Sequence, residues 1–284
     1  MVDPTCRRRA VLMLQDRLDM SEREACRVTG QARSTQQRTP KCERPDDPDR
    51  WLRDWLNEWA NEPDNARKGY RRAWGDLRYE EGLVINKKKV HRVWREEGLQ
   101  VAKRRRRKRV GASSGPIVDA DAPNVVWVID FQFDSTADGR KFKIASMVDE
   151  HTRESLLDIT ARSITGDDLV TALKLVIAER GLPVLIRCDN GPELISDALR
   201  EFCEDQIGIR YIPPGEPWRN GFIESFNNRV RDECLNMNQW ITLLHAKVGI
   251  TDFKTNYNAR HRHSSLDYQT PTEYASACSH THRL

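Results

Sequence analysis

Seven consecutive cationic residues, at positions 103–109, constrain the folding of this 284-residue chain more than any other feature. A block of like charges cannot be packed into a core and stays extended until it meets counterions, so it separates the segments on either side of it. Residues 111–124 continue the spacer with glycine, serine and proline, and we expect the linker there. The chain is therefore predicted to fold in at least two parts.

The two sides of this spacer differ in charge. Residues 1–116 hold 29 lysines and arginines against 18 acidic residues, a net charge of +11, whereas residues 117–284 carry a net charge of −7. A basic half is typical of a segment that binds a polyanion, and an acidic half can use carboxylates for chemistry. The seven cysteines have no paired spacing, which favours reduced thiols in the cytosol, and no apolar run is long enough to predict a membrane span.

Residues 1–44 are predicted to form a helix-turn-helix-like module. Ser21 and Glu24 make a capping box that begins a second helix, a Thr-Gly turn follows, and a polar helix is expected over residues 31–38. A small helical bundle with a polar outer face would have the same signature. The expected apolar positions of the first helix are Val11, Leu14 and Leu18.

Residues 45–110 are predicted to be a second, more basic helical region. Trp51, Trp55 and Trp59 recur every four residues, a spacing typical of a core-facing helix. A later helix begins at the cap residue Asn86, and its outer face is rich in cations. The side chains predicted to contact DNA are Lys87, Lys88, Arg92 and Arg95 on this helix, with Arg104, Arg105, Arg106 and Arg107 from the cationic block.

From residue 125 the pattern changes to alternating strands and helices. Three strands in succession are followed by helix, strand, helix, strand and helix, which indicates an α/β fold with a mixed sheet covered by helices. The predicted strands are residues 125–131, 141–148, 155–160, 184–187 and 207–212, and the predicted helices are residues 167–180, 196–205 and 221–235.

Three acidic residues in this part have unusual surroundings. Asp130 lies inside an apolar strand, where an ionised carboxylate is costly without a compensating cation. Asp189 follows the end of a strand, and Glu224 belongs to a polar helix stripe with Asn227, Asn228 and Arg231. Such a trio suits phosphodiester chemistry, in which two hard cations about 3.5–4 Å apart clamp the attacking and leaving oxygens. Oxygen ligands favour Mg²⁺ or Mn²⁺.

Three segments resemble the integrase-core signatures of bacterial insertion-sequence transposases of the OrfB type, which are similar to retroviral integrases. They are WVIDF at 127–131, CDNGPE at 188–193 and PPGEPWRNGFIESFNNRVRDECL at 213–235. Residues 70–99 resemble that family's basic helical region, and residues 257–266 and 270–274 its C-terminal block. One departure is a separation of 34 residues between Asp189 and Glu224, where the family usually has 35.

This resemblance implies a ribonuclease-H-like catalytic core over residues 125–284 with a C-terminal helical extension. Asp130, Asp189 and Glu224 would be its catalytic triad and would hold two Mg²⁺ ions, for which Mn²⁺ can substitute. Arg231 would lie along the DNA, and residues 213–219 would form a loop beside the site. The implied activity is cleavage of transposon ends and joining of the 3′-hydroxyl to target DNA.

The resemblance also implies partners, and two alternative functions remain open. The protein would act as a homo-oligomer on double-stranded DNA in the bacterial cytoplasm, at the nucleoid. It would do so in some cases as a frameshift fusion with, or as a partner of, an upstream-frame protein that supplies a helix-turn-helix and a leucine zipper. One alternative is a DNA-binding regulator whose core no longer catalyses. Another is a metal-dependent nuclease that acts on RNA–DNA hybrids, which shares the fold.

Overall fold

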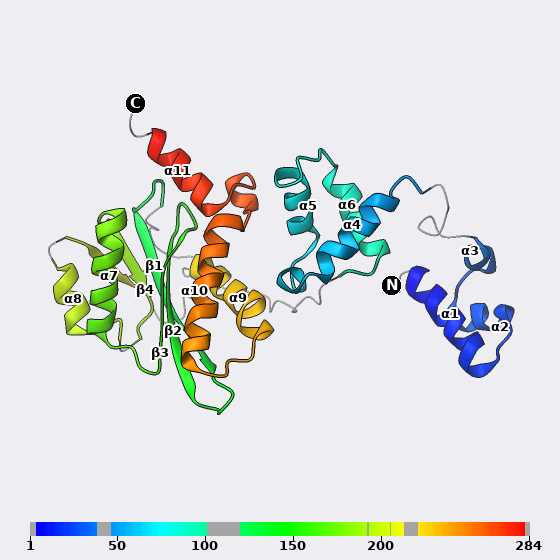
Figure 1. Ribbon diagram of the computed structural model, residues 1–284, viewed down its shortest axis with the longest axis horizontal. Coiled ribbons are helices and arrows are strands. Elements are labelled where there is room, and N and C mark those ends of the chain that lie inside the picture. Colours follow the sequence, from blue (N-terminus) through cyan, green and yellow to red (C-terminus); the bar gives the residue numbers. More distant parts are fainter. Residues whose placement is uncertain are drawn as a thin grey trace. The chain divides into compact units, whose positions relative to one another are not determined.

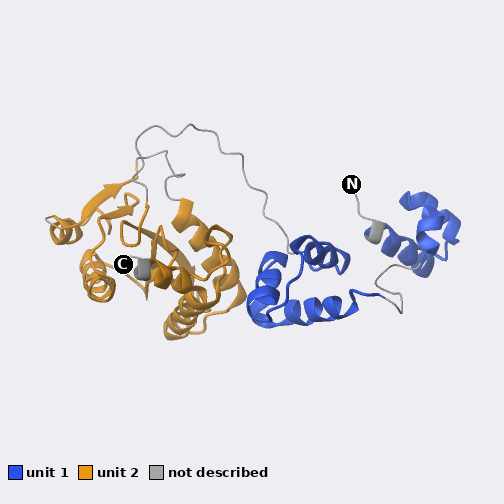
Figure 2. Ribbon diagram, turned by 90° about the horizontal axis from the view of Figure 1, so that it is seen from above, with its two compact units in different colours: residues 1–104 blue, residues 105–284 orange. Residues whose placement is uncertain are grey.

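The computed structural model describes residues 4–38, 47–100, 120–191, 193–204, 206–212 and 221–281. The chain divides into two compact units, residues 1–104 and residues 105–284, which Figure 2 shows in different colours. The cationic residues 103–109, the segment 213–219 and Asn220 lie outside the described residues. In the described part of the chain, no helix is long and apolar enough to cross a membrane.

The first helices of unit 1 are α1 (Pro4–Leu18), α2 (Glu22–Thr29) and α3 (Arg33–Gln37). The predicted capping box is confirmed, because the Ser21 side chain accepts from the Glu24 N–H and the Glu24 side chain accepts from the Ser21 N–H. Gly30 ends α2 with a φ of +65°, a left-handed conformation that glycine adopts without strain. Val11 is buried and Leu14 packs partly buried beside it, as predicted, but Leu18 at the end of α1 is exposed.

The second helical group is α4 (Arg50–Asn61), α5 (Tyr70–Tyr79) and α6 (Lys87–Glu96), with a 3-10 turn at Pro63–Asn65. The predicted cap is confirmed by a hydrogen bond of 2.8 Å from the Lys88 N–H to the Asn86 side chain. The tryptophan stripe is only partly in the core, because Trp59 is buried whereas Trp51 is 46% exposed. The buried apolar residues of this group are Leu52, Leu56, Trp59, Ala73, Leu77, Val90, Val93 and Trp94.

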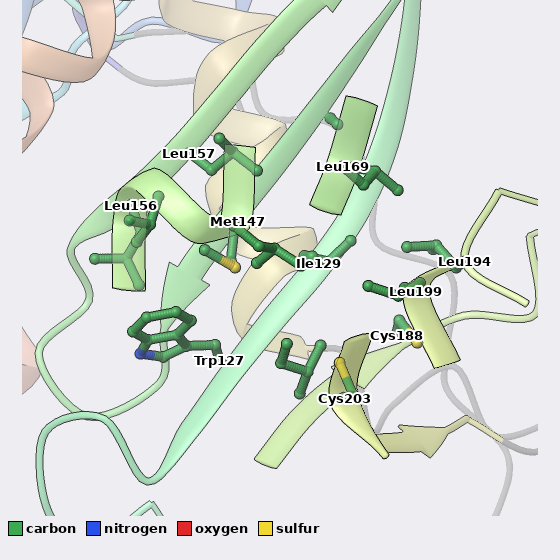
Figure 3. Packing of buried hydrophobic residues seen from close by; sticks show 14 of the residues in the cluster. Trp127, Ile129, Met147, Leu156, Leu157, Leu169, Cys188, Leu194, Leu199 and Cys203 are labelled. Carbon is green, nitrogen blue, oxygen red and sulfur yellow. The ribbon is translucent and has the colours of Figure 1, made fainter. Parts of the chain in front are cut away.

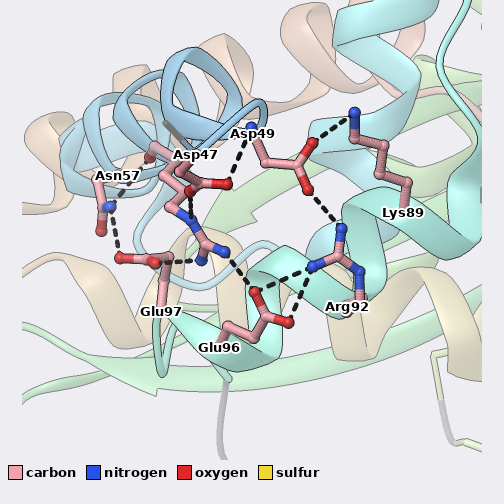
Figure 4. A network of polar contacts seen from close by, with 8 residues as sticks. Asp47, Asp49, Asn57, Lys89, Arg92, Glu96 and Glu97 are labelled. Carbon is pink, nitrogen blue, oxygen red and sulfur yellow. Dashed lines mark hydrogen bonds and ion pairs between the residues drawn. The ribbon is translucent and has the colours of Figure 1, made fainter. Parts of the chain in front are cut away.

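A network of charged side chains joins α4 to α6 (Figure 4). The buried guanidinium of Arg53 contacts Asp47 at 2.7 Å, Glu96 at 2.5 Å and Glu97 at 2.7 Å. Its three acidic partners raise the pKa of Arg53 against the opposing effect of burial, so it stays charged. A buried cation is tolerated only when it is paired in this way.

Replacing Arg53 by methionine should destabilise unit 1. Three carboxylates would lose their common partner, and we expect a loss of about 2–3 kcal/mol, less than for a fully buried cluster because Glu96 and Glu97 are partly exposed. Urea unfolding followed by tryptophan fluorescence measures it, since five of the eight tryptophans lie between residues 51 and 94. Arg50→Met, an exposed change on the same helix, should cost less than about 0.5 kcal/mol. Equal midpoints for the two variants would contradict the prediction.

Unit 2 is built on a five-stranded mixed sheet, which confirms the predicted α/β fold (Figure 1). The strands are β1 (Val126–Ser135), β2 (Lys141–Asp149), β3 (Ser155–Ala161), β4 (Leu185–Cys188) and β5 (Gly208–Tyr211), in the order β3-β2-β1-β4-β5. β1, β2 and β3 pair antiparallel, whereas β1, β4 and β5 pair parallel. β1 extends four residues beyond the predicted end because its pairing with β2 continues to Ser135 and Lys141.

Helices cover both faces of this sheet. On one face, α7 (Gly166–Arg180) and α8 (Asp197–Cys203) pack on Trp127, Ile129 and Cys188 (Figure 3). On the other face, α9 (Gly221–Glu233) and α10 (Leu243–Arg260) pack on Val126, Val128 and Ile144, among others. Short 3-10 turns at Leu235–Met237 and Ser264–Leu266 flank α10, and the helix α11 (Pro271–Thr281) follows.

Two side chains of α10 bind the backbone of the outer strand β3. The Asn258 amide accepts from the Ser155 N–H at 2.8 Å and donates to the Ser155 carbonyl at 2.9 Å. Lys254, one turn earlier on α10, donates to the next carbonyl, that of Leu156, at 2.8 Å. Backbone groups at the edge of the sheet are thus satisfied by helix side chains.

Candidate active site and nucleic-acid interface

The pairing of β1 with β4 sets Asp130 and Asp189 beside each other. The parallel register ends with Ile129 opposite Cys188, and the next residue on each segment is the acid. Side chains alternate between the faces of a strand, and Ile129 belongs to the core beneath α7 and α8. Asp130 therefore points to the opposite face, where α9 lies.

Glu224 approaches the same place from the first turn of α9. The helix is fixed to the sheet by Ile223, Phe226 and Val230, which are buried against β1 and β2. Glu224 is half-buried beside them. The charges of both Asp189 and Glu224 act on the carboxyl of Asp130. Asn227, one turn after Glu224 on α9, donates to that carboxyl, so the three predicted acids lie in the same part of the unit.

The electrostatics of Asp130 show how crowded this site is. Burial raises the pKa of Asp130 to about 6, the carboxylates of Asp189 and Glu224 add to the shift, and hydrogen bonds from Phe131 and Asn227 oppose it. The Phe131 N–H donates to Oδ1 at 2.9 Å, and the Asn227 Nδ2 donates to Oδ2 at 2.8 Å. Three carboxylates in a half-buried space repel one another, and a cation among them would remove that cost.

The donor set fits a hard divalent cation. Three carboxylates offer oxygen ligands only, the type that Mg²⁺ and Mn²⁺ prefer. Within the ranges described, no three acidic, histidine or cysteine side chains converge tightly enough to form a finished metal site. The three carboxylates therefore lie in one part of the unit without forming a closed set of ligands.

The loop that carries Asp189 is fastened to β2. The Gly191 N–H donates to Asp189 Oδ1 at 2.9 Å, and a Cβ at residue 191 would lie 3.0 Å from that oxygen, so glycine suits this position. Further along the loop, Glu193 pairs with Lys143 of β2, whose ammonium also lies 5.4 Å from the centroids of the Phe131 and Phe133 rings. Sequence reasoning missed Lys143, because no local pattern connects two residues so far apart in the chain.

The predicted polar stripe on α9 divides into three kinds of position. Asn227 is 8% exposed and its amide is bonded to Asp130 and Gln132, so it faces the carboxylates and not the solvent. Three residues along a helix bring Asn227 back to the side that Glu224 occupies, and its contact with DNA stays a prediction. Asn228 is exposed, and Arg231 is half-buried, with its guanidinium donating to the Phe133 carbonyl at 3.0 Å.

The predicted basic face of α6 is smaller than expected. Lys87, Lys88 and Arg95 are exposed. Arg92 is partly exposed, but its guanidinium contacts Asp49 at 2.5 Å and Glu96 at 2.9 Å (Figure 4). Its charge is therefore largely used within the protein. Arg104, Arg105, Arg106 and Arg107 lie outside the described residues.

Sequence comparisons agree with this architecture. The Integrase core domain matches residues 120–217 and, in a second form, residues 205–271, and an HTH-like domain matches residues 61–108. An uncharacterized 31.7 kDa protein of insertion element IS407 from Burkholderia multivorans is 37% identical over 264 residues, 93% of each chain. An uncharacterized 39.2 kDa protein of IS476 from Xanthomonas euvesicatoria is 36% identical, covering 96% of this chain and 78% of that protein. The transposase of IS904 from Lactococcus lactis is 27% identical, covering 69% and 83%.

The fold also has a relative among solved structures. The simian T-cell lymphotropic virus intasome, solved in complex with PP2A regulatory subunit B56 gamma, aligns with a TM-score of 0.50 and 15% identity, over 71% of this chain and 73% of that chain. Together these observations define a ribonuclease-H-like integrase core that follows HTH-like helices. The chain belongs to the family of integrase-core insertion-sequence transposases of the OrfB type.

Breaking the Lys143–Glu193 pair should loosen the loop that carries Asp189. Lys143→Met and Glu193→Gln should each raise the exchange rate of the Gly191 N–H by about fivefold, as expected for a half-buried pair worth about 1 kcal/mol. The double variant should raise this exchange rate little further, because either change alone removes the interaction. Hydrogen exchange read by mass spectrometry measures it, and Asp197→Asn, which breaks an exposed pair on α8, is the control. Unchanged exchange in both single variants would show that the pair does not hold the loop.

Proposed function

We propose that this protein cleaves the ends of its insertion sequence and joins the resulting 3′-hydroxyl to target DNA by two-metal phosphoryl transfer. The observation that supports the proposal is the position of Asp130 and Asp189 at the paired ends of β1 and β4, with the charge of Glu224 on α9 acting on the Asp130 carboxyl. Membership of the transposase family supplies the substrate class, DNA.

In this proposal Asp130, Asp189 and Glu224 hold two Mg²⁺ ions, and Mn²⁺ can replace them. When bound, such ions stabilise the attacking and leaving oxygens of an in-line displacement at phosphorus. The protein's own contribution is to fix the three carboxylates and to hold the DNA. Water attacks first at the transposon end, and the released 3′-hydroxyl attacks the target, so no side chain forms a covalent bond to DNA.

Contacts with DNA would come from both units. On α6, Lys87, Lys88 and Arg95 are exposed and can take phosphates. The block that includes Arg104, Arg105, Arg106 and Arg107 adds sequence-independent charge. Arg231 and Asn228 lie on the helix that carries Glu224, and we place them beside the DNA near the scissile bond.

The assembly is part of the same proposal. Two transposon ends must be cut and joined together, so we expect several copies to act as a homo-oligomer on DNA at the bacterial nucleoid. An upstream-frame protein with a helix-turn-helix and a leucine zipper would supply further end binding.

Asp189→Asn should abolish joining without loss of folding. A neutral amide is a poor ligand for a hard divalent cation, and we expect strand transfer to fall by about a hundredfold or more. The assay is cleavage and joining of the element's own ends in Mg²⁺, with DNA affinity and thermal unfolding measured on the same samples. Asp197→Asn, an exposed acid on α8, is the matched control and should join at the wild-type rate. Wild-type joining by Asp189→Asn would refute the triad, and a wild-type protein that binds ends but never joins them would support the regulator.

Removing Lys87 and Lys88 together should weaken DNA binding in a salt-dependent way. Each phosphate contact contributes about 0.9 to the slope of log K against log salt, so the double alanine variant should flatten the slope by about 1.8. Arg92→Ala should change the slope less, because its guanidinium already pairs with Asp49 and Glu96. Fluorescence anisotropy across a salt series measures both. A larger change with Arg92→Ala would show that the acidic partners release it to DNA.

A further inference from the structure

A chain of two hydrogen bonds ends on the carboxylate of Asp130. Gln132 lies two residues after Asp130 on β1 and therefore on the same face of the sheet. Its Nε2 donates to Asn227 Oδ1 at 2.7 Å, and Asn227 Nδ2 donates to Asp130 Oδ2 at 2.8 Å. Gln132 is 6% exposed and Asn227 8%, so water has little access to either amide.

The direction of this chain is fixed by chemistry. An ionised carboxylate only accepts hydrogen bonds, so Asn227 must turn its NH₂ group toward Asp130. Its carbonyl oxygen then faces away and needs a donor, which the NH₂ of Gln132 provides. Without Gln132, the Asn227 carbonyl oxygen would lose its donor, and only the contact with Asp130 would favour one orientation of the amide. A flipped amide would place an oxygen against the carboxylate.

The chain also joins the two elements that carry acids. Gln132 and Asp130 belong to β1, whereas Asn227 lies three residues after Glu224 on α9. The remaining oxygen of Asp130 accepts from the Phe131 N–H, so both carboxylate oxygens have a protein donor that limits rotation. The position of Asp130 relative to Glu224 therefore depends on the amide pair.

We propose that Gln132 is a positioning residue which, through Asn227, orients the Asp130 carboxylate and sets the site's affinity for divalent cations. This inference rests on the proposed function, because it assumes that Asp130 is a metal ligand. Partners that orient metal ligands typically contribute 10- to 100-fold to metal affinity. Mg²⁺ demands a nearly ideal octahedral arrangement, so a carboxylate that is free to rotate should bind it less well.

The test measures metal binding and joining on the full-length protein. Gln132→Met keeps the length of the side chain but cannot donate, and Gln132→Leu, smaller and equally unable to donate, is measured in parallel so that one poorly packed variant does not decide the result. Calorimetric titration with Mn²⁺ should show affinity about tenfold weaker, and half-maximal joining should need about tenfold more Mg²⁺. At saturating Mg²⁺, the maximal joining rate of both Gln132 variants should be close to that of the wild type. Gln239→Met, an exposed change in the same unit, should leave both values unchanged.

A double-mutant cycle with Asn227→Leu separates positioning from a general structural role. If Gln132 acts through Asn227, then Gln132→Met should weaken Mn²⁺ binding no further once Asn227 is leucine. A general structural role would instead make the fold-losses of Mn²⁺ affinity of the two single variants multiply in the double variant. That result, or wild-type Mn²⁺ affinity in either folded Gln132 variant, would overturn the inference.

The variant Asp130→Asn tests the proposed function separately from the role of Gln132. If that variant binds Mn²⁺ and joins DNA like the wild type, Asp130 is not a ligand, and both the proposed function and this inference fail. If it loses both properties while the Gln132 variants lose neither, the proposed function stands and the role of Gln132 alone is refuted.

Discussion

The functional end of the core depends on the register between two parallel strands. Ile129 and Cys188 are buried on the face beneath α7 and α8, and the residue after each is acidic. A slip of one residue in either strand would turn an acid into the apolar core and an apolar side chain toward the carboxylates. The hydrophobic packing of one face therefore holds the two aspartates together on the other, although no bond connects them.

The third acid is also positioned by hydrophobic packing, that of helix α9 on the sheet. Phe226 and Val230 bury one side of the helix against the sheet, which leaves Glu224 and Asn227 beside β1. Burial raises the pKa of Asp130, and the charges of Asp189 and Glu224 add to the shift, so ionised carboxylates cost free energy at this place. The buried amides of Asn227 and Gln132 offset part of that cost, because they provide donors where water is scarce.

Sequence alone could predict most of the sheet and single out the three acids, because each has a recognisable local context. Asp130 interrupts a β-branched run, and Asp189 follows one. The role of Asn227 could not be predicted in this way, since a polar helix stripe looks the same whether it faces solvent or a polar site. The pairing of Arg92 could not be predicted for a related reason: its partner Asp49 lies 43 residues earlier, and no local pattern shows that a surface cation is already paired.

The contact of Asn258 with Ser155 has a consequence for how copies of this protein can associate. The outer strand of a sheet exposes unpaired N–H and C=O groups, which invite strands of other molecules and so aggregation. On β3 the Asn258 amide occupies one such pair, and the Lys254 ammonium takes the next carbonyl. At the start of β3, side chains of a helix thus take the place of a neighbouring strand. A strand of a second copy could not pair with these backbone groups.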